Sequence, residues 1–103
     1  MATRVISQFI AGTDDRKVVA AAGTPEALGT TAIIGVCIVA ESDNTGNIAV
    51  GMSNAVRAAA GSQKGLAILA ARESVFVPAQ SLANVWIDAS VSGDGVAFTA
   101  VTS

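Results

Sequence analysis

The sequence contains no histidine and only one cysteine, Cys37. Without histidine, the common Ser-His-Asp triad, imidazole metal ligands and the usual metal site of cupin-type barrels are excluded. A single cysteine cannot form an internal disulfide, and a reactive thiolate here would lack a neighbouring histidine base. Cys37 lies in the apolar run AIIGVCIVA (32–40), so we expect it to be a small buried hydrophobic residue.

Charged residues are also scarce, at 14% of the chain against about 25% in ordinary soluble domains. The basic residues are scattered and the net charge is −2, so we expect no binding to a nucleic acid backbone. Aromatic residues are too few for a base-stacking platform. A small domain has a large surface for its volume and should need more charge, not less. Either alanine and glycine lie harmlessly on the surface, or other subunits cover much of it.

No segment resembles a membrane span or an export signal. The apolar run 32–40 is shorter than the roughly 20 residues that a bilayer requires. The N-terminal stretch MATRVISQFIAGTDDRK lacks the apolar core and small-residue cleavage site of a signal peptide. We therefore expect synthesis in a cytoplasm, no export by that route and no membrane partner.

What the sequence does contain is a series of short β-type runs separated by turn residues. Residues 12–15 (GTDD) are predicted to form a turn, while 42–46 and 92–95 are predicted to be hairpin turns. Residues 53–65 are predicted mostly as loop, and 24–26 could open one helical turn. The pattern predicts an all-β fold, a single small antiparallel β-sandwich or jelly-roll-like domain of about seven to eight short strands. The expected strands are residues 3–10, 17–22, 33–40 (buried on both faces), 47–52, 66–70, 73–78, 84–89 and 96–101.

The stretch DASVSGDG (88–95) allows two interpretations. Its first part matches the D-x-S-x-S-G start of a calcium loop, but the twelfth position, which requires glutamate, is Thr99. Strand patterns rather than helices flank it. We therefore expect a hairpin between the last two strands, with Asp88 solvated on an outer face and no metal or cofactor site.

Two aromatic residues are predicted to point away from the core. In the expected strand 84–89, Asn84, Trp86 and Asp88 share the face opposite the apolar one, and Phe76 has the same orientation in its own strand. Exposed aromatics are favoured interface anchors. The alternative is that another segment of the same chain covers them.

Several pieces in a fixed order resemble a group of small tailed-bacteriophage virion proteins. Their pattern combines an NTG-x-hydrophobic-x-VG hairpin, an L-x-x-G-E-S turn and strand, and a strand ending in DA before a Gly-Asp turn. The resemblance spans about residues 18–101, with Arg72 where the pattern usually has glycine and Ala49 where it often has an aromatic. The matching pieces are AAGTPEAL (21–28), AESDNTGNIAVG (40–51), LAARESVFVP (69–78), SLANVWIDAS (81–90) and SGDGVAF (92–98).

The resemblance implies a compact jelly-roll β-sandwich and a place in the virion, assembled in the bacterial host cytoplasm. The leading hypothesis is a capsid decoration, or cement, protein that binds the major capsid protein as a homo-oligomer, a trimer or a dimer. A tail, connector or fibre-base subunit is the alternative. A carbohydrate- or receptor-binding module, using Trp86 with Asn84 and Asp88, is an alternative of another class. No catalytic residue carries over, and we expect no enzyme activity.

The N-terminal segment, residues 1–17, lies outside this resemblance, and residues 18–103 are the expected sandwich. The segment could be an arm that orders on its partner and extends a sheet, with Phe9 and Ile10 as anchors. It could equally be the first strand of the sandwich.

Overall fold

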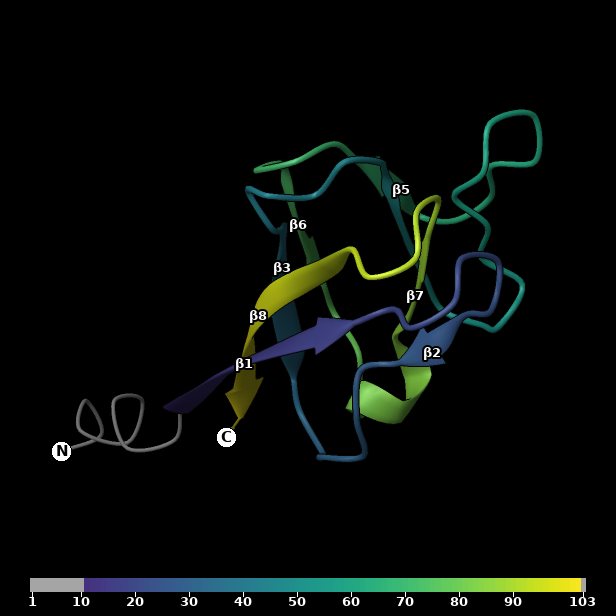
Figure 1. The fold of residues 1–103 in the computed structure, drawn as a ribbon. Coiled ribbons are helices and arrows are strands. Elements are labelled where there is room, and N and C mark those ends of the chain that lie inside the picture. Colours follow the sequence, from purple (N-terminus) through teal and green to yellow (C-terminus); the bar gives the residue numbers. More distant parts are fainter. Residues whose placement is uncertain (1–10, 103) are drawn as a thin grey trace, which may run out of the picture.

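The chain folds into a β-sandwich of two four-stranded antiparallel sheets, as the computed structural model of residues 11–102 shows (Figure 1). Sheet A has the strand order β1-β8-β3-β6, and sheet B has the order β2-β7-β4-β5. The all-β sandwich expected from the sequence is confirmed. The elements are β1 Ala11–Val18, β2 Glu26–Ala27, β3 Gly35–Ala40, β4 Ile48–Gly51, β5 Ala67–Leu69, β6 Ser74–Val77, the short 3₁₀ helix η1 Leu82–Asn84, β7 Trp86–Ala89 and β8 Gly95–Thr102.

Successive strands mostly change sheet. β1 and β2, β3 and β4, β5 and β6, and β7 and β8 each lie in opposite sheets, and only β4 and β5 are sequence neighbours paired in one sheet. This is a jelly-roll-like connectivity, which places long-range partners side by side in each sheet. The turns at 42–46 and 92–95 therefore cross from one sheet to the other, and the hairpins expected at both places are wrong.

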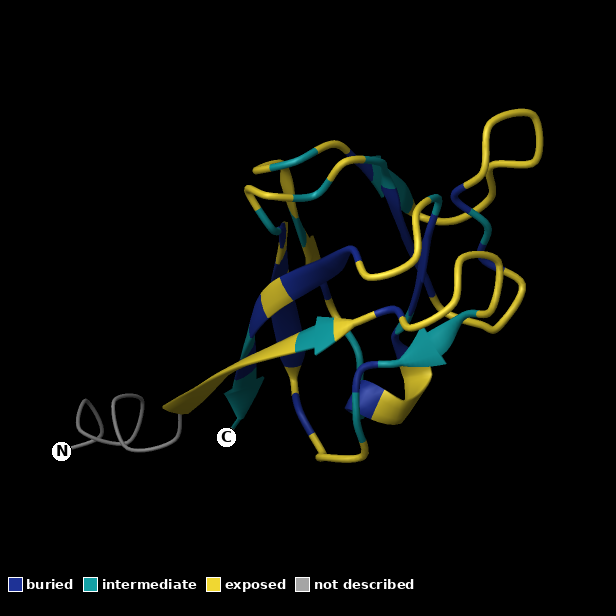
Figure 2. Cartoon of the chain, viewed as in Figure 1, coloured by how far each residue is buried: buried dark blue, intermediate teal, exposed yellow. Residues whose placement is uncertain are grey.

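The core lies between the two sheets and follows strand alternation. On sheet A, Val36, Ile38 and Phe98 point inward, and on sheet B, Ile48 and Ile87 point inward. All of these side chains are at most 5% exposed. In β3 the alternate residues are exposed, so the prediction that this strand is buried on both faces is wrong (Figure 2).

The first strand differs most from the sequence prediction. Residues 12–15, expected as a turn, lie within β1, which pairs with β8 from Ala11 opposite Thr102 to Val18 opposite Gly95. All residues of β1 except Lys17 are exposed, so the strand has no need for an apolar alternation and instead carries turn-type residues (Figure 2). Residues 11–17 are thus part of the sandwich, whereas Phe9 and Ile10 lie outside the described residues.

Arg72 occupies a left-handed backbone conformation, with φ of 74°, between β5 and β6. This region favours glycine, because a Cβ atom crowds the following carbonyl. Arg72 is the position at which the bacteriophage pattern usually has glycine. The departure in sequence therefore falls on a turn whose geometry glycine would adopt more easily.

Candidate protein-interaction surface

The outer face of sheet B is covered by the chain's own loop between β4 and β5. Trp86 is half-buried and packs against a small cluster formed by Ala49, Val56 and Ala58. Val56 and Ala58 belong to that loop and are at most 3% exposed. Trp86 does point away from the main core, as predicted, but a segment of the same chain covers it.

Asp88 lies beneath the same loop and is completely buried. Its Oδ1 accepts a hydrogen bond from Gly23 N–H, and its Oδ2 accepts one from Ala58 N–H, both at 2.9 Å. The expectation that Asp88 is solvated is therefore wrong. A buried carboxylate is tolerated here because each oxygen has a backbone donor.

The other polar residues of 88–95 make similar contacts with neighbouring loops. Ser90 Oγ accepts from Asn47 N–H and Ser92 Oγ accepts from Ala22 N–H, each at 2.8 Å. Asp94 Oδ2 accepts from Gly46 N–H at 2.8 Å. The stretch is a sheet-to-sheet crossing whose side chains hold three loops in place. Within residues 11–102, no three His, Cys, Asp or Glu side chains gather as a metal site.

The outer face of sheet A, in contrast, is an open apolar surface. Cys37 of β3 lies between Thr99 of β8 and Phe76 of β6, because these residues are directly opposite one another in the ladders. Phe76 is 56% exposed, and its ring rests over Gly35, which has no side chain to obstruct it. The sheet A face, as we call it, consists of Gly35, Cys37, Val39, Phe76, Ala97 and Thr99. Its β1 flank is charged, because Asp14 and Arg16 lie opposite Thr99 and Ala97, and Thr99 Oγ1 donates to Asp14 Oδ1 at 2.7 Å.

Cys37 is exposed on this face, so the prediction that it is a buried hydrophobic residue is wrong. The apolar run 32–40 supplies both the core side of β3 and its outer side. Val39, which follows Cys37 on the same face, is 37% exposed. Apolar residues on an outer face cost little in the isolated domain but become favourable when a partner covers them.

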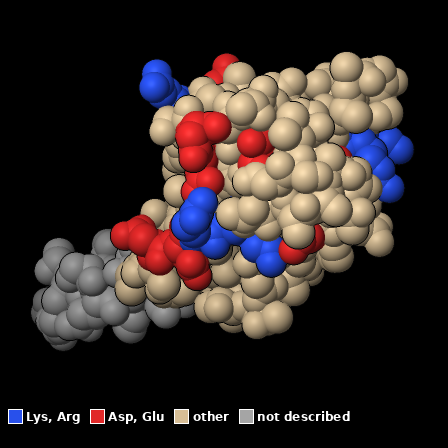
Figure 3. Space-filling model, viewed as in Figure 1, with Lys and Arg blue, Asp and Glu red and all other residues tan. Residues whose placement is uncertain are grey.

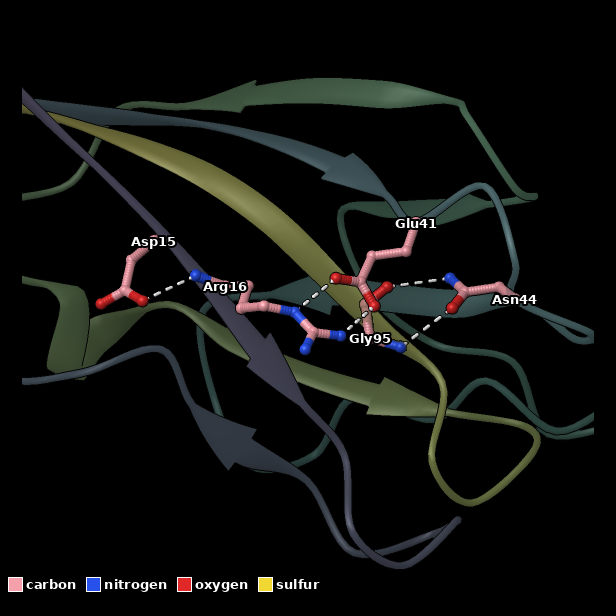
Figure 4. A network of polar contacts seen from close by, with 5 residues as sticks. All are labelled: Asp15, Arg16, Glu41, Asn44 and Gly95. Atoms are coloured by element: carbon pink, nitrogen blue, oxygen red, sulfur yellow. Dashed lines mark hydrogen bonds and ion pairs between the residues drawn. The ribbon is translucent and has the colours of Figure 1, made fainter.

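Charged residues gather beside the sheet A face, on β1 and the turn that follows β3 (Figure 3). Arg16 donates from Nε and Nη2 to the two carboxylate oxygens of Glu41, both at 2.8 Å (Figure 4). The hydrogen bonds to Glu41, together with its negative charge, raise the pKa of the Arg16 guanidinium. Asn44 of the same turn bonds both backbone groups of Gly95, which locks β8 to this corner.

A second ion pair, at the residue next to Arg16, links the C-terminal end of β1 to β2. Lys17 Nζ lies 3.1 Å from Glu26 Oε1, and Glu26 Oε2 accepts from Ala20 N–H at 3.0 Å. The bond from Ala20, followed by that from Lys17, lowers the pKa of the Glu26 carboxyl. The chain between β1 and β2 is therefore held against both strands.

The four predicted interface residues that are described do not form one surface. Phe76 lies on the sheet A face, Trp86 and Asp88 lie under the loop on sheet B, and Asn84 is an exposed residue of η1. Sequence reasoning missed Cys37 and Val39. The only sequence signal for their exposure is that they alternate with the buried residues of β3. Because every residue of the run 32–40 is apolar, the two faces of the strand cannot be told apart by polarity.

No family model, curated protein or solved structure matches this chain. Within residues 11–102, no helix is long and apolar enough to cross a membrane. In the described part of the chain, the loop between β4 and β5 covers the outer face of sheet B, whereas the outer face of sheet A is exposed.

Proposed function

We propose that the protein is a structural virion protein of the capsid decoration, or cement, type, which binds the outside of a bacteriophage shell and bridges neighbouring coat subunits. The observation that carries the proposal is the open sheet A face, since it exposes Val39 and Phe76 and has its charges on the β1 flank. The order of sequence pieces that resembles small bacteriophage virion proteins supports it as well.

The proposed role is mechanical rather than chemical. Each copy would bury the sheet A face, with Phe76 as its aromatic anchor, against the major capsid protein. Small contacts repeated over many copies would resist the internal pressure of the packaged genome. The virion tail remains the alternative location for the same sandwich. The glycan-binding alternative loses support, because Asp88 is buried with both oxygens occupied.

Replacing Phe76 with serine should weaken binding to coat shells about tenfold or more, because an interface anchor is lost. The measurement is co-sedimentation of purified protein with shells that lack it. Leu66→Ser is the matched control, since Leu66 is 58% exposed, against 56% for Phe76, but precedes β5 in the other sheet. Equal binding by the two variants, with both folded, would contradict the choice of this face.

A further inference from the structure

The free edge of β1 is suited to pairing with a second copy of itself. β1 has β8 on one side and no strand on its other side within residues 11–102. The side to which each residue's backbone N–H and C=O point can be worked out from Val19, the residue just after β1, whose N–H donates to Asp94 O. In an antiparallel strand these backbone groups point alternately to one side and the other. The backbone groups of the odd-numbered residues of β1 therefore point to β8, and those of the even-numbered residues point to the free edge. Arg16 fits this alternation, since its N–H bonds the Asp15 carboxylate at 2.8 Å.

The sequence along this edge is Asp14-Asp15-Arg16-Lys17, two acids followed by two bases. Read antiparallel against itself, such a block brings acids toward bases. We propose that two copies pair through their β1 edges across a two-fold axis perpendicular to sheet A, forming one continuous eight-stranded sheet.

Symmetry limits the possible registers. Side chains that are directly opposite share a face, so a two-fold axis perpendicular to the sheet must place one residue opposite its own copy. With Asp15 at that position, residues 12–18 of one copy pair with residues 18–12 of the other. Asp14 then faces Arg16 of the second copy, and this contact occurs twice. Both residues have their backbone groups on the free edge, as the ladder requires.

The existing contacts of β1 bear on this register. Asp14 Oδ1 already accepts a hydrogen bond from Thr99 Oγ1 at 2.7 Å, which leaves Oδ2 for the second copy. Glu41 uses Nε and Nη2 of Arg16, and the guanidinium has further N–H donors for Asp14 of the second copy. Asp15 faces its own copy, which is unfavourable, although Lys17 of the second copy lies on the diagonal of the same face. The Asp15 carboxylate must also release Arg16 N–H to the new ladder. Asp14 therefore favours pairing and Asp15 opposes it.

The pairing goes beyond the proposed attachment to a shell and does not depend on it. The axis perpendicular to the sheet keeps the two sheet A faces on the same side of the dimer. One platform with two apolar patches results, each with a Phe76 anchor, and the Asp14 and Arg16 side chains of the two β1 strands lie between them. Any partner bound there would meet two copies at once.

The test compares two substitutions that change net charge equally. In the full chain, Asp14→Asn should raise the dimer dissociation constant about fivefold, because two contacts with Arg16 are lost. Asp15→Asn should lower this dissociation constant about threefold, because the repulsion between Asp15 and its own copy is lost. Sedimentation equilibrium over a wide concentration range measures both. A chain that stays monomeric at every concentration would overturn the proposal. The charges on the β1 edge would then serve to prevent edge-to-edge aggregation. A shift in the same direction for both variants would also overturn it.

Cross-linking tests the register separately. In a Cys37→Ser background, Asp15→Cys should form an intermolecular disulfide under mild oxidation, because residue 15 faces its own copy. Asp14→Cys should do so much less, since residue 14 faces residue 16. Equal cross-linking of the two variants would contradict the register.

Discussion

Replacing Asp88 with asparagine is expected to lower the free energy of unfolding by about 2–3 kcal/mol, although the two side chains have nearly the same size. Both carboxylate oxygens accept backbone N–H groups, from Gly23 and from Ala58. An asparagine amide offers one oxygen and one NH₂ group, so one of the two backbone donors would face another donor. Asp88→Ala should cost more, about 3–5 kcal/mol, because both donors lose their acceptor.

Urea unfolding measures the loss, and Asp43→Asn is the control, since Asp43 is exposed on the turn after β3. The control should change stability by less than about 0.5 kcal/mol. Hydrogen exchange at the Ala58 amide adds a local readout, because this amide should lose protection before the rest of the sandwich. An unchanged unfolding midpoint for Asp88→Asn would show that the carboxylate does not hold the loop.

Replacing Gly95 with alanine should be similarly damaging, at about 3 kcal/mol or more. An added Cβ would lie 2.5 Å from the backbone oxygen of Lys17 and 3.0 Å from the Cα of Val18. Both contacts involve backbone atoms of the paired strand β1, which cannot move without opening the β1–β8 ladder. Gly95 also bonds Asn44 through its N–H and its carbonyl, so the turn after β3 would shift as well.

Gly93→Ala separates this effect from ordinary backbone strain. Gly93 has φ of 93°, but a Cβ there would have nothing within 4 Å. Its substitution should cost only about 1 kcal/mol, the usual cost of a left-handed conformation. Thermal or urea unfolding of the two variants gives the comparison. Equal losses would mean that the approach of β1 to Gly95 is not a tight constraint.

The strands were predictable wherever one face is buried and turn residues mark the ends. Period-two alternation correctly placed Val85, Ile87 and Ala89 toward the core and Trp86 away from it. The sequence could not predict which strands pair, since Asn44-Thr45-Gly46 and Ser92-Gly93-Asp94 are as suitable for a crossing between sheets as for a hairpin. Turn chemistry is local, whereas sheet membership depends on partners far along the chain.

The same limit applies to the candidate surface. Phe76 was predicted to be exposed, and it is. Trp86 had the same sequence signature, but Val56 and Ala58, in a segment predicted mostly as loop, return to cover it. Asp88 looked like a solvated or metal-binding carboxylate because its two backbone partners lie 65 and 30 residues away in the sequence. No spacing rule could identify these partners.

The central claim, a place on the outer shell of a virion, is tested most directly by the copy number of this chain in purified particles. Quantitative peptide mass spectrometry would measure it against the major coat protein. The proposal predicts a ratio near one, or another fixed large fraction of the coat copies. A handful of copies per particle would move the protein to the tail or the portal vertex, and its absence from particles would contradict the virion assignment altogether.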